Sequence, residues 1–293
     1  MPKLFLLLLF CSIALSAFSQ DIQKLQQDFQ AQLKKGANKY GEDSIKGRFY
    51  NLRGFKMYCE IYGQGEPLLI IHGNGGSIKD FVYQLPYFAK KYKVIIADSR
   101  AQGRSADSGD SLSYEMMADD YADLLTTLKI DSANVIGWSD GGINGLLLAI
   151  RHPEKVKKLA ITGANLTPDS SAVNEDVINM IKPIYNTLKN NTQKNANQKA
   201  QWKLMRLLLD EPHISLSALE KIQCPTLVIG GDHDVLKPAH TLLIFQHIPH
   251  AYLWILPNSG HSTPVIYKDD FNKNVGAFLS QPYRVIEKEA RFF

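Results

Sequence analysis

Short continuous apolar runs alternate with longer amphipathic stretches over most of the chain. Apolar runs without a polar face are typical of strands that are buried on both sides of a parallel sheet. The stretches between them carry apolar residues at helical spacing. This alternation predicts βαβ units, and therefore an α/β fold with a mostly parallel sheet flanked by helices. The predicted strands are Pro67–Ile71, Tyr92–Ala97, Asn134–Trp138, Lys158–Thr162, Thr226–Gly230 and Ala251–Leu256, and the predicted helices are Ile78–Lys90, Tyr114–Lys129, Gly141–Arg151, Ala239–Ile248 and Phe271–Ser280.

Two regions depart from this alternation. In RFYNLRGFKMYCEIYGQG, apolar and polar residues alternate on either side of a central Arg-Gly pair, which predicts an antiparallel hairpin. Over residues 164–222 no buried strand is predicted, and a polar stretch rich in Asn and Lys gives way to the helical segment QWKLMRLLLD. We therefore predict an α/β core over residues 46–163 and 223–293, with a small helical cap inserted over residues 164–222.

The N-terminus has a different character. Lys3 precedes an apolar run from Leu4 to Leu15, and small residues stand at positions 17 and 19. The run is too short to span a membrane as a helix and matches a secretory signal peptide. We expect a signal peptide over residues 1–19, cleaved near Ser19, and a secreted or periplasmic protein. Residues 20–45 carry apolar residues at a spacing of four, which predicts a leader helix.

The composition narrows the function without identifying it. The 293 residues carry 33 Lys and Arg against 29 Asp and Glu, and these charges are scattered along the chain. A nucleic-acid partner is therefore not expected, because phosphate binding needs a clustered basic face. Cys11, Cys59 and Cys224 form no CxxC pair, so neither a zinc nor a redox motif is predicted. Cys59 and Cys224 lie in strand-like contexts, where we expect them to be buried and unpaired.

The strongest chemical motif is GWSDGG, at residues 137–142. A buried run ends at Trp138, and the apolar helical stretch GGINGLLLAI follows. This matches G-x-S-x-G, in which a sharp strand-to-helix turn exposes the serine hydroxyl above the sheet. Ser139 is therefore predicted to be a nucleophile, rather than a serine that only caps the helix.

A serine hydroxyl needs a base that is itself held by a third group. In hydrolases with this turn, an acid and then a histidine follow the serine along the chain. Asp232 and Asp234 follow one buried strand and His261 follows the next. We favour Asp234 as the acid because it lies deeper in its loop, and we interpret Asp232 as a turn former. The other seven histidines are predicted to be surface, packing or loop-bracing residues: His72, His152, His213, His233, His240, His247 and His250.

A glycine-rich loop, HGNGGS, follows the predicted strand that ends at Ile71. Backbone N–H groups of such a loop, together with the N–H of the residue after the nucleophile, can bind a developing oxyanion. A glycine-rich loop before a helix can also bind phosphate. Neither the GxGxxG nor the GxxxxGKS spacing is present, so we expect an oxyanion loop.

The segments HGNGGS, DSRAQGRS, GWSDGG, GGDHD and the later GH together resemble the α/β-hydrolase superfamily over about residues 47–281. The resemblance implies an eight-stranded sheet. The chemistry that it implies needs neither a metal nor an organic cofactor. In DSRAQGRS, Ala101 stands where the family has glycine. The site residues that the resemblance implies are Ser139, His261 and Asp234 as the catalytic triad and the backbone amides of Asn74 and Asp140 as the oxyanion hole.

The GWSDGG turn is similar to that of the biphenyl hydrolase-like (valacyclovir hydrolase-like) branch. In that branch the acid after the nucleophile is associated with a substrate amino group, which implies that Asp140 contacts substrate. Gly73 and Trp138, which lie next to the nucleophile or its loop, are further candidates for substrate contacts. The alternative is that Asp140 only suits the positive N-terminus of the following helix.

These observations predict a serine hydrolase that cleaves a small-molecule carboxylic ester through an acyl-enzyme. The expected partner is a small ester or amide, the expected state is a monomer or homodimer, and no membrane insertion is expected after signal removal. The same triad would also serve an aminopeptidase, a C–C bond hydrolase or a perhydrolase, and the cap decides between them. A non-catalytic binding protein on a hydrolase scaffold is the other alternative, which the intact triad disfavours.

Overall fold

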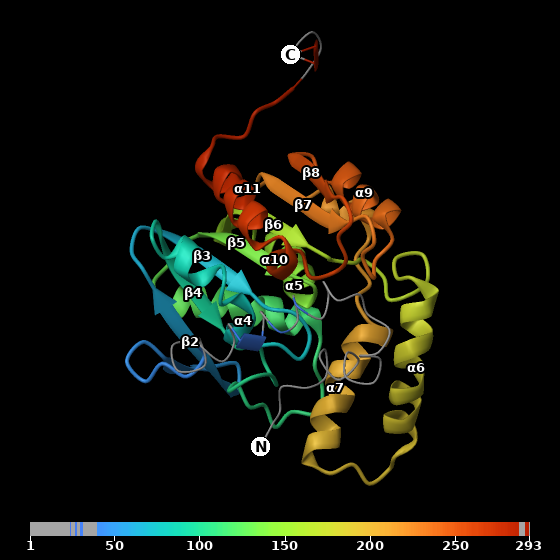
Figure 1. The fold of residues 1–293 in the computed structure, drawn as a ribbon. Coiled ribbons are helices and arrows are strands. Elements are labelled where there is room, and N and C mark those ends of the chain that lie inside the picture. Colours follow the sequence, from blue (N-terminus) through green and yellow to red (C-terminus); the bar gives the residue numbers. More distant parts are fainter. Residues whose placement is uncertain (1–23, 25–26, 28–29, 32–39, 287–290, 293) are drawn as a thin grey trace.

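The computed structural model describes residues 24, 27, 30–31, 40–286 and 291–292, and the predicted signal peptide over residues 1–19 lies outside them. One eight-stranded sheet forms the centre of the molecule (Figure 1). Its strands are β1 (Arg48–Leu52), β2 (Phe55–Tyr62), β3 (Glu66–Ile71), β4 (Tyr92–Ala97), β5 (Ala133–Trp138), β6 (Val156–Thr162), β7 (Thr226–Gly231) and β8 (Ala251–Leu256).

The strands lie in the order β1-β2-β4-β3-β5-β6-β7-β8. β1 and β2 form the predicted antiparallel hairpin, and β2 is antiparallel to β4. All other neighbours are parallel. The predicted α/β class and the mostly parallel eight-stranded sheet are confirmed.

Helices connect the strands and cover both faces of the sheet (Figure 1). They are η1 (Ile78–Phe81), α3 (Leu85–Phe88), α4 (Tyr114–Thr127), α5 (Asp140–Arg151), η2 (Pro153–Lys155), α6 (Glu175–Asn190), α7 (Ala196–Asp210), α8 (Leu216–Leu219), α9 (Pro238–His247), α10 (Thr263–Ile266) and α11 (Lys268–Ser280).

Successive residues of the central strands pack on opposite faces of the sheet. In β3, Leu69 and Ile71 join a core cluster with α4 and α5, whereas Leu68 and Ile70 join a second cluster with α3 and α11. All four side chains are fully buried. A strand that is covered on both sides has no solvent-facing position for a polar residue, which explains the continuous apolar runs in the sequence.

The single helix predicted over Ile78–Lys90 is wrong, because this segment forms two short helices, η1 and α3. Pro86 stands in the first turn of α3. Proline has no N–H group, so it cannot continue the hydrogen-bond ladder of a preceding turn. Gln84, at the junction, instead donates a side-chain hydrogen bond to the carbonyl oxygen of Pro264 at 2.7 Å.

The leader helix predicted over residues 20–45 is wrong for residues 40–45, because residues 40–46 form bends and a turn. The buried carboxylate of Glu60 accepts hydrogen bonds from the backbone N–H groups of Gly41 and Asp43, at 2.7 and 2.9 Å. These bonds hold the backbone in a non-helical path. The few earlier residues of the segment that the structure describes are helical.

The segment predicted as a cap carries α6, α7 and α8. α6 and α7 lie side by side at one end of the molecule (Figure 1). Among the residues of α6, all of which the structure describes, only Leu188 is buried. α7 buries Leu204 and Leu207 in the same core cluster as α4 and α5. α7 is therefore the helix of this pair that contacts the core.

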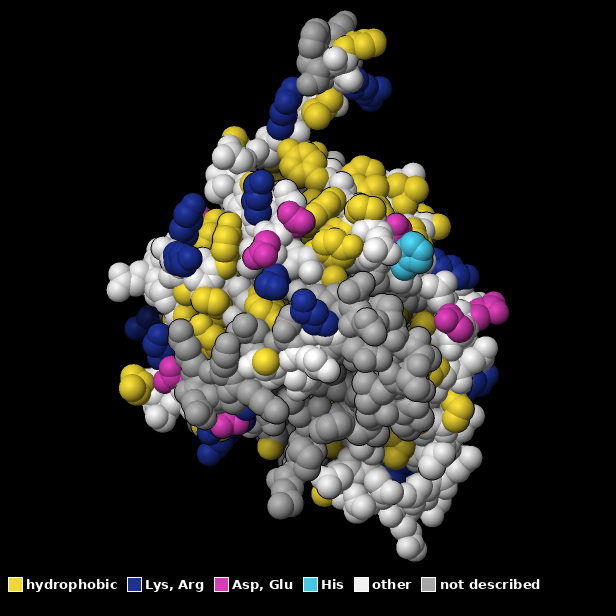
Figure 2. Space-filling view, viewed as in Figure 1, with side chains coloured by type: hydrophobic (Ala, Val, Ile, Leu, Met, Phe, Trp, Pro, Cys, Tyr) yellow, Lys and Arg dark blue, Asp and Glu magenta, His cyan; other side chains and the backbone are white. Residues whose placement is uncertain are grey.

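Both cysteines within the described residues are unpaired, as predicted. Cys59 is buried in β2, as predicted, but the burial predicted for Cys224 is wrong, because this residue precedes β7 and is only partly buried. Over the described residues, no helix has the length and hydropathy that crossing a membrane requires. On the face shown in Figure 2, Lys and Arg side chains are scattered among acidic and apolar ones rather than gathered in one patch.

Candidate active site

Ser139 lies in the sharp turn between β5 and α5. Its backbone has φ 57° and ψ −122°, a strained conformation that the surrounding structure must hold. The N–H of Ser139 donates to the carbonyl oxygen of Thr162 at 2.9 Å, and its own carbonyl oxygen accepts from the N–H of Gly142 at 2.7 Å. A Cβ on Gly137 would lie 2.1 Å from the carbonyl oxygen of Gly141, so the turn requires the small residues of the motif.

The structure brings Ser139, Asp234 and His261 into one chain of hydrogen bonds. Nε2 of His261 lies 2.9 Å from Oγ of Ser139, and Nδ1 lies 2.7 Å from Oδ1 of Asp234. The three residues follow β5, β7 and β8, so they meet at the carboxyl edge of the sheet. The side chains of His261 and Asp234 are 15% and 1% exposed. This arrangement allows the imidazole to accept the serine proton while the carboxylate fixes the ring.

Burial and charge act in opposite directions on this His–Asp pair. Burial alone would lower the pKa of His261, but the Asp234 carboxylate, with a smaller contribution from Asp140, leaves it above its ordinary value of 6.5. Burial alone would raise the pKa of Asp234, but the facing His261 leaves it below its ordinary value of 3.8. Both pKa shifts are the ones expected when an ionised Asp234 stabilises a positively charged imidazole.

The loop after β3 passes directly beside the nucleophile. A Cβ on Gly73 would lie 3.0 Å from Cβ of Ser139, so only glycine allows this approach without displacement. The N–H of Gly75 already donates to a side-chain oxygen at 2.7 Å. Within the described residues, the N–H of Asn74 has no acceptor. The N–H of Asp140, the first residue of α5, has none inside its helix. These two amides are the ones predicted for the oxyanion hole, and that role stays a prediction.

The side chains of Asn74, Tyr114 and Asp140 form a buried polar cluster behind the nucleophile. Nδ2 of Asn74 donates to Oδ2 of Asp140 at 2.8 Å, and the hydroxyl of Tyr114 lies near the same carboxylate. Burial raises the pKa of Asp140 to about 6, although both partners favour the charged form. The sequence marked Asn74 only through its backbone, and no sequence pattern marked Tyr114.

The loop that carries His261 is held from two sides. Nε1 of Trp138 donates to the carbonyl oxygen of His261 at 2.9 Å. The carboxylate of Asp232 accepts from the N–H groups of Asn258 and Ser259, at 2.9 and 3.0 Å. Asp232 is thus a turn former, and Trp138 supports the histidine. The substrate contact predicted for Trp138 stays a prediction.

His72 braces the oxyanion loop, as the sequence predicted. Its Nε2 accepts from the N–H of Ser99 at 2.9 Å, and its Nδ1 donates to the carbonyl oxygen of Gly73 at 2.7 Å. Burial lowers the pKa of His72 to about 4, so the ring is neutral at physiological pH. A neutral ring is what this acceptor-and-donor pair of contacts requires.

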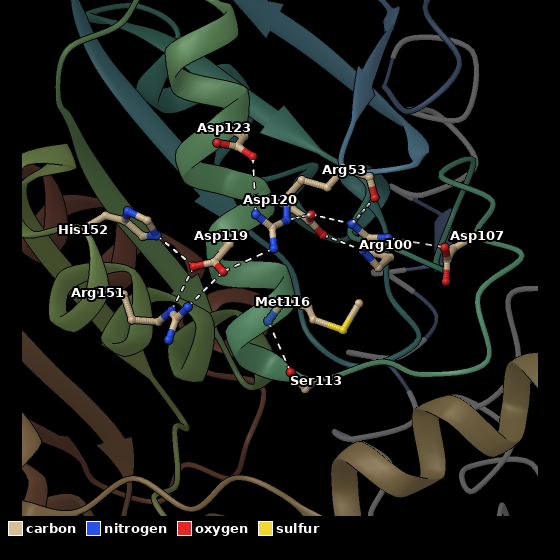
Figure 3. A network of polar contacts seen from close by, with 10 residues as sticks. All are labelled: Arg53, Arg100, Asp107, Ser113, Met116, Asp119, Asp120, Asp123, Arg151 and His152. Atoms are coloured by element: carbon tan, nitrogen blue, oxygen red, sulfur yellow. Dashed lines mark hydrogen bonds and ion pairs between the residues drawn. The ribbon is translucent and has the colours of Figure 1, made fainter.

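A network of ion pairs fixes the loop between β4 and α4 (Figure 3). Arg100 binds both carboxylate oxygens of Asp120, at 2.7 and 2.6 Å, and lies 3.4 Å from Asp107. Asp107 in turn binds Nζ of Lys203, on α7, at 3.0 Å. These four side chains are almost wholly buried. The network therefore ties the loop before Tyr114 to α7.

Comparison with known proteins agrees with this fold. A family model described as alpha/beta hydrolase fold matches residues 66–192. Serine hydrolase BPHL of Mus musculus is 30% identical over 249 residues, which cover 78% of this chain and 84% of that protein.

More distant proteins are similar as well. The 2-hydroxy-6-oxo-6-(2'-aminophenyl)hexa-2,4-dienoic acid hydrolase of Metapseudomonas resinovorans is 23% identical over 269 residues, which cover 82% of this chain and 93% of that protein. The solved structure of Est816, described as an N-acyl homoserine lactone degrading enzyme, has a TM-score of 0.66 and 25% identity, covering 79% of this chain and 100% of its own. The chain therefore belongs to the α/β-hydrolase superfamily, in its biphenyl hydrolase-like branch.

Proposed function

We propose that this protein is an exported serine hydrolase that cleaves a carboxylic ester of a small molecule through an acyl-enzyme. The observation that carries the proposal is the chain of hydrogen bonds from Ser139 through His261 to Asp234, with distances of 2.9 and 2.7 Å. Each of the three groups has the partner that its chemical step requires.

In the acylation step, Nε2 of His261 takes the proton of the Ser139 hydroxyl while Oγ bonds to the substrate carbonyl carbon. The carbonyl oxygen gains negative charge, which the N–H groups of Asn74 and Asp140 bind. The carbon–oxygen bond to the leaving group then breaks, and His261 passes its proton to the leaving alcohol. Asp234 stabilises the imidazolium between these two transfers.

In the deacylation step, His261 takes a proton from water, and the resulting hydroxide adds to the acyl carbon. The bond between that carbon and Oγ breaks, and the proton returns to Ser139. The products are a carboxylic acid and the free enzyme. Because these side chains and water carry every proton, the scheme calls for no cofactor.

The ester bond is the substrate class that we favour within the family. Similarity to Est816 supports it, because the lactone named for that protein is a cyclic ester. The names of the relatives indicate different substrates, such as a carbamate and a dienoic acid, and we infer that the cap rather than the triad selects among them. Aminopeptidase, C–C bond and perhydrolase chemistry are the alternatives.

Export is proposed from residues 1–19 alone, with their basic start, apolar run and small residues at positions 17 and 19. Expression of the full chain followed by N-terminal sequencing tests this. A mature protein that begins at Gln20 in the secreted or periplasmic fraction is expected, and an intact Met1 in the cytoplasm contradicts it.

A fluorophosphonate probe with a substrate panel tests the activity. We expect an adduct on Ser139, hydrolysis of p-nitrophenyl esters or lactones, and a loss of kcat of about 10³-fold or more in Ser139→Ala. Ser215→Ala, on the cap surface, is the matched control and should keep wild-type kcat. Absence of an adduct favours a non-catalytic scaffold. Turnover of anilides without esters favours the aminopeptidase alternative.

A further inference from the structure

The side chain of Asn74 joins three parts of the molecule that are far apart in the sequence. Its Nδ2 donates to Oδ2 of Asp140 at 2.8 Å and to the carbonyl oxygen of Leu204 at 3.2 Å. An amide nitrogen has two N–H groups, so both are used. Asn74 lies in the loop after β3, Asp140 begins α5, and Leu204 lies in α7. Asn74 is 4% exposed, so water cannot freely replace either bond.

Tyr114 makes a second connection between the same parts. Its hydroxyl lies near the Asp140 carboxylate, whose charged form it favours, and donates to the carbonyl oxygen of Leu207 at 3.4 Å. Leu204 and Leu207 are one turn apart on α7, so their side of the helix faces this cluster. The carbonyl of Leu207 is one of the last four of its helix, which lack intrahelical donors. The Asn74 side chain therefore connects the Asp140 carboxylate to α7, and the Tyr114 hydroxyl lies between the same two parts.

We propose that Asn74 is a positioning residue whose side-chain amide fixes the two backbone donors of the oxyanion hole and makes their position depend on α7. This inference rests on the proposed function. The two donors are the backbone N–H groups of Asn74 and Asp140, and the side chains of the same two residues are bonded to each other. That bond restrains the spacing of the donors, which is the preorganisation that oxyanion binding requires.

The same contacts bear on what the Asp140 carboxylate does. It is 3% exposed and already accepts a hydrogen bond from Asn74, which suits a structural anion better than a receptor for a substrate amine. The other charged groups near it are His261, whose pKa it raises, and Glu211, whose carboxylate accepts from the backbone N–H of Tyr114 at 3.2 Å. Removal of the Asn74 amide destabilises the charged form of Asp140 and so weakens its support of the imidazolium.

The test is Asn74→Ala, which keeps the backbone N–H and removes only the side-chain amide. Rates on a p-nitrophenyl ester are expressed per active site titrated with the fluorophosphonate, so that misfolded protein is not counted. We expect kcat to fall about 10- to 100-fold with KM changed less than about threefold, as for a misplaced catalytic group. The acid limb of the kcat/KM profile should also move to lower pH. Asn191→Ala, in the turn between α6 and α7, is the matched control and should leave both readouts unchanged.

A kcat per active site within about threefold of wild type, or an equal loss in the control, overturns the inference. If Asn74→Ala gives no folded protein, Tyr114→Phe removes one hydroxyl from the same cluster and must change the same two readouts in the same direction. Wild-type protein that is neither labelled nor active would instead refute the proposed function. Active wild type with an unaffected variant refutes only the positioning role.

Discussion

Gly163, which follows β6, lies against the imidazole of His261, and a single methyl group there tests how narrowly the triad is confined. Its φ is +65°, and an added Cβ would lie 2.7 Å from Cε1 and 2.9 Å from Nδ1 of His261. Carbon atoms in contact normally lie about 3.5–4.0 Å apart. Gly163→Ala must therefore displace the ring by roughly 0.8 Å or more, away from its hydrogen bonds with Ser139 and Asp234.

Two magnitudes follow from this geometry. A catalytic group misplaced by about 1 Å loses about 10²-fold in rate, so kcat/KM should fall about 30- to 100-fold. A residue with a Cβ in the left-handed region costs about 1–2 kcal/mol, so the free energy of unfolding should fall by at least that amount. The variant is thus expected to stay folded while losing most of its activity.

Gly54→Ala separates the two effects. Gly54 lies in the turn between β1 and β2 with φ +85°, and nothing lies within 4 Å of its added Cβ. It carries the backbone strain without the collision. Urea unfolding should show a stability loss in both variants, larger in Gly163→Ala because the collision adds to the backbone strain. Ester hydrolysis per titrated active site should show a rate loss only in Gly163→Ala. If the two variants lose the same rate, or if Gly163→Ala stays within about threefold of Gly54→Ala, the imidazole is not confined in the way the structure indicates.

The remaining predictions concern charge. kcat/KM should fall as the pH drops through the pKa of His261, which is raised above 6.5, because only the neutral imidazole can take the serine proton. A pH profile that is flat down to about pH 5 contradicts this. Asp140→Asn removes a charge that raises this pKa, so the acid limb should move to lower pH on all esters alike; a loss confined to α-amino esters would instead assign the carboxylate to a substrate amine. Lys203→Met leaves the buried Asp107 with one cation fewer and should lower the free energy of unfolding by about 2–4 kcal/mol in urea titrations; a change below about 0.5 kcal/mol would mean that Arg100 alone neutralises Asp107.

The sheet and the triad geometry could be predicted from the sequence because strong local constraints specify them. β3 is buried on both faces and has no position for a polar residue, so its continuous apolar run identifies it as a strand of the parallel sheet. The nucleophile turn tolerates only small neighbours, which makes Ser139 recognisable. The choice of Asp234 over Asp232 followed from loop depth, and in the structure Asp234 faces His261 while Asp232 binds the backbone before it.

Contacts between distant segments could not be predicted in this way. The bond from Asn74 to Leu204 spans 130 residues, and no periodicity encodes it. The error at Ile78–Lys90 had a local cause, since apolar spacing favoured one helix where Pro86 interrupts it. Ala101 adopts φ 62°, a left-handed conformation that glycine adopts without strain, which fits the glycine that the resemblance implies at that position.

The predicted cap is attached to the core on both sides of the triad, which makes it part of the catalytic geometry rather than a separate cover. Ahead of α6, the side-chain amide of Asn174 donates to the carbonyl oxygen of Asp234 at 2.9 Å, so the start of the cap holds the loop of the acid. On the other side, the carbonyl of Leu204 in α7 binds the Asn74 side chain in the oxyanion loop. α6 lies between these two attachments and, among its residues, buries only Leu188. Substitutions at the exposed positions of α6 should therefore leave the reacting groups in place, whereas changes in α7 at Leu204 or at Asn174 should alter the rate itself.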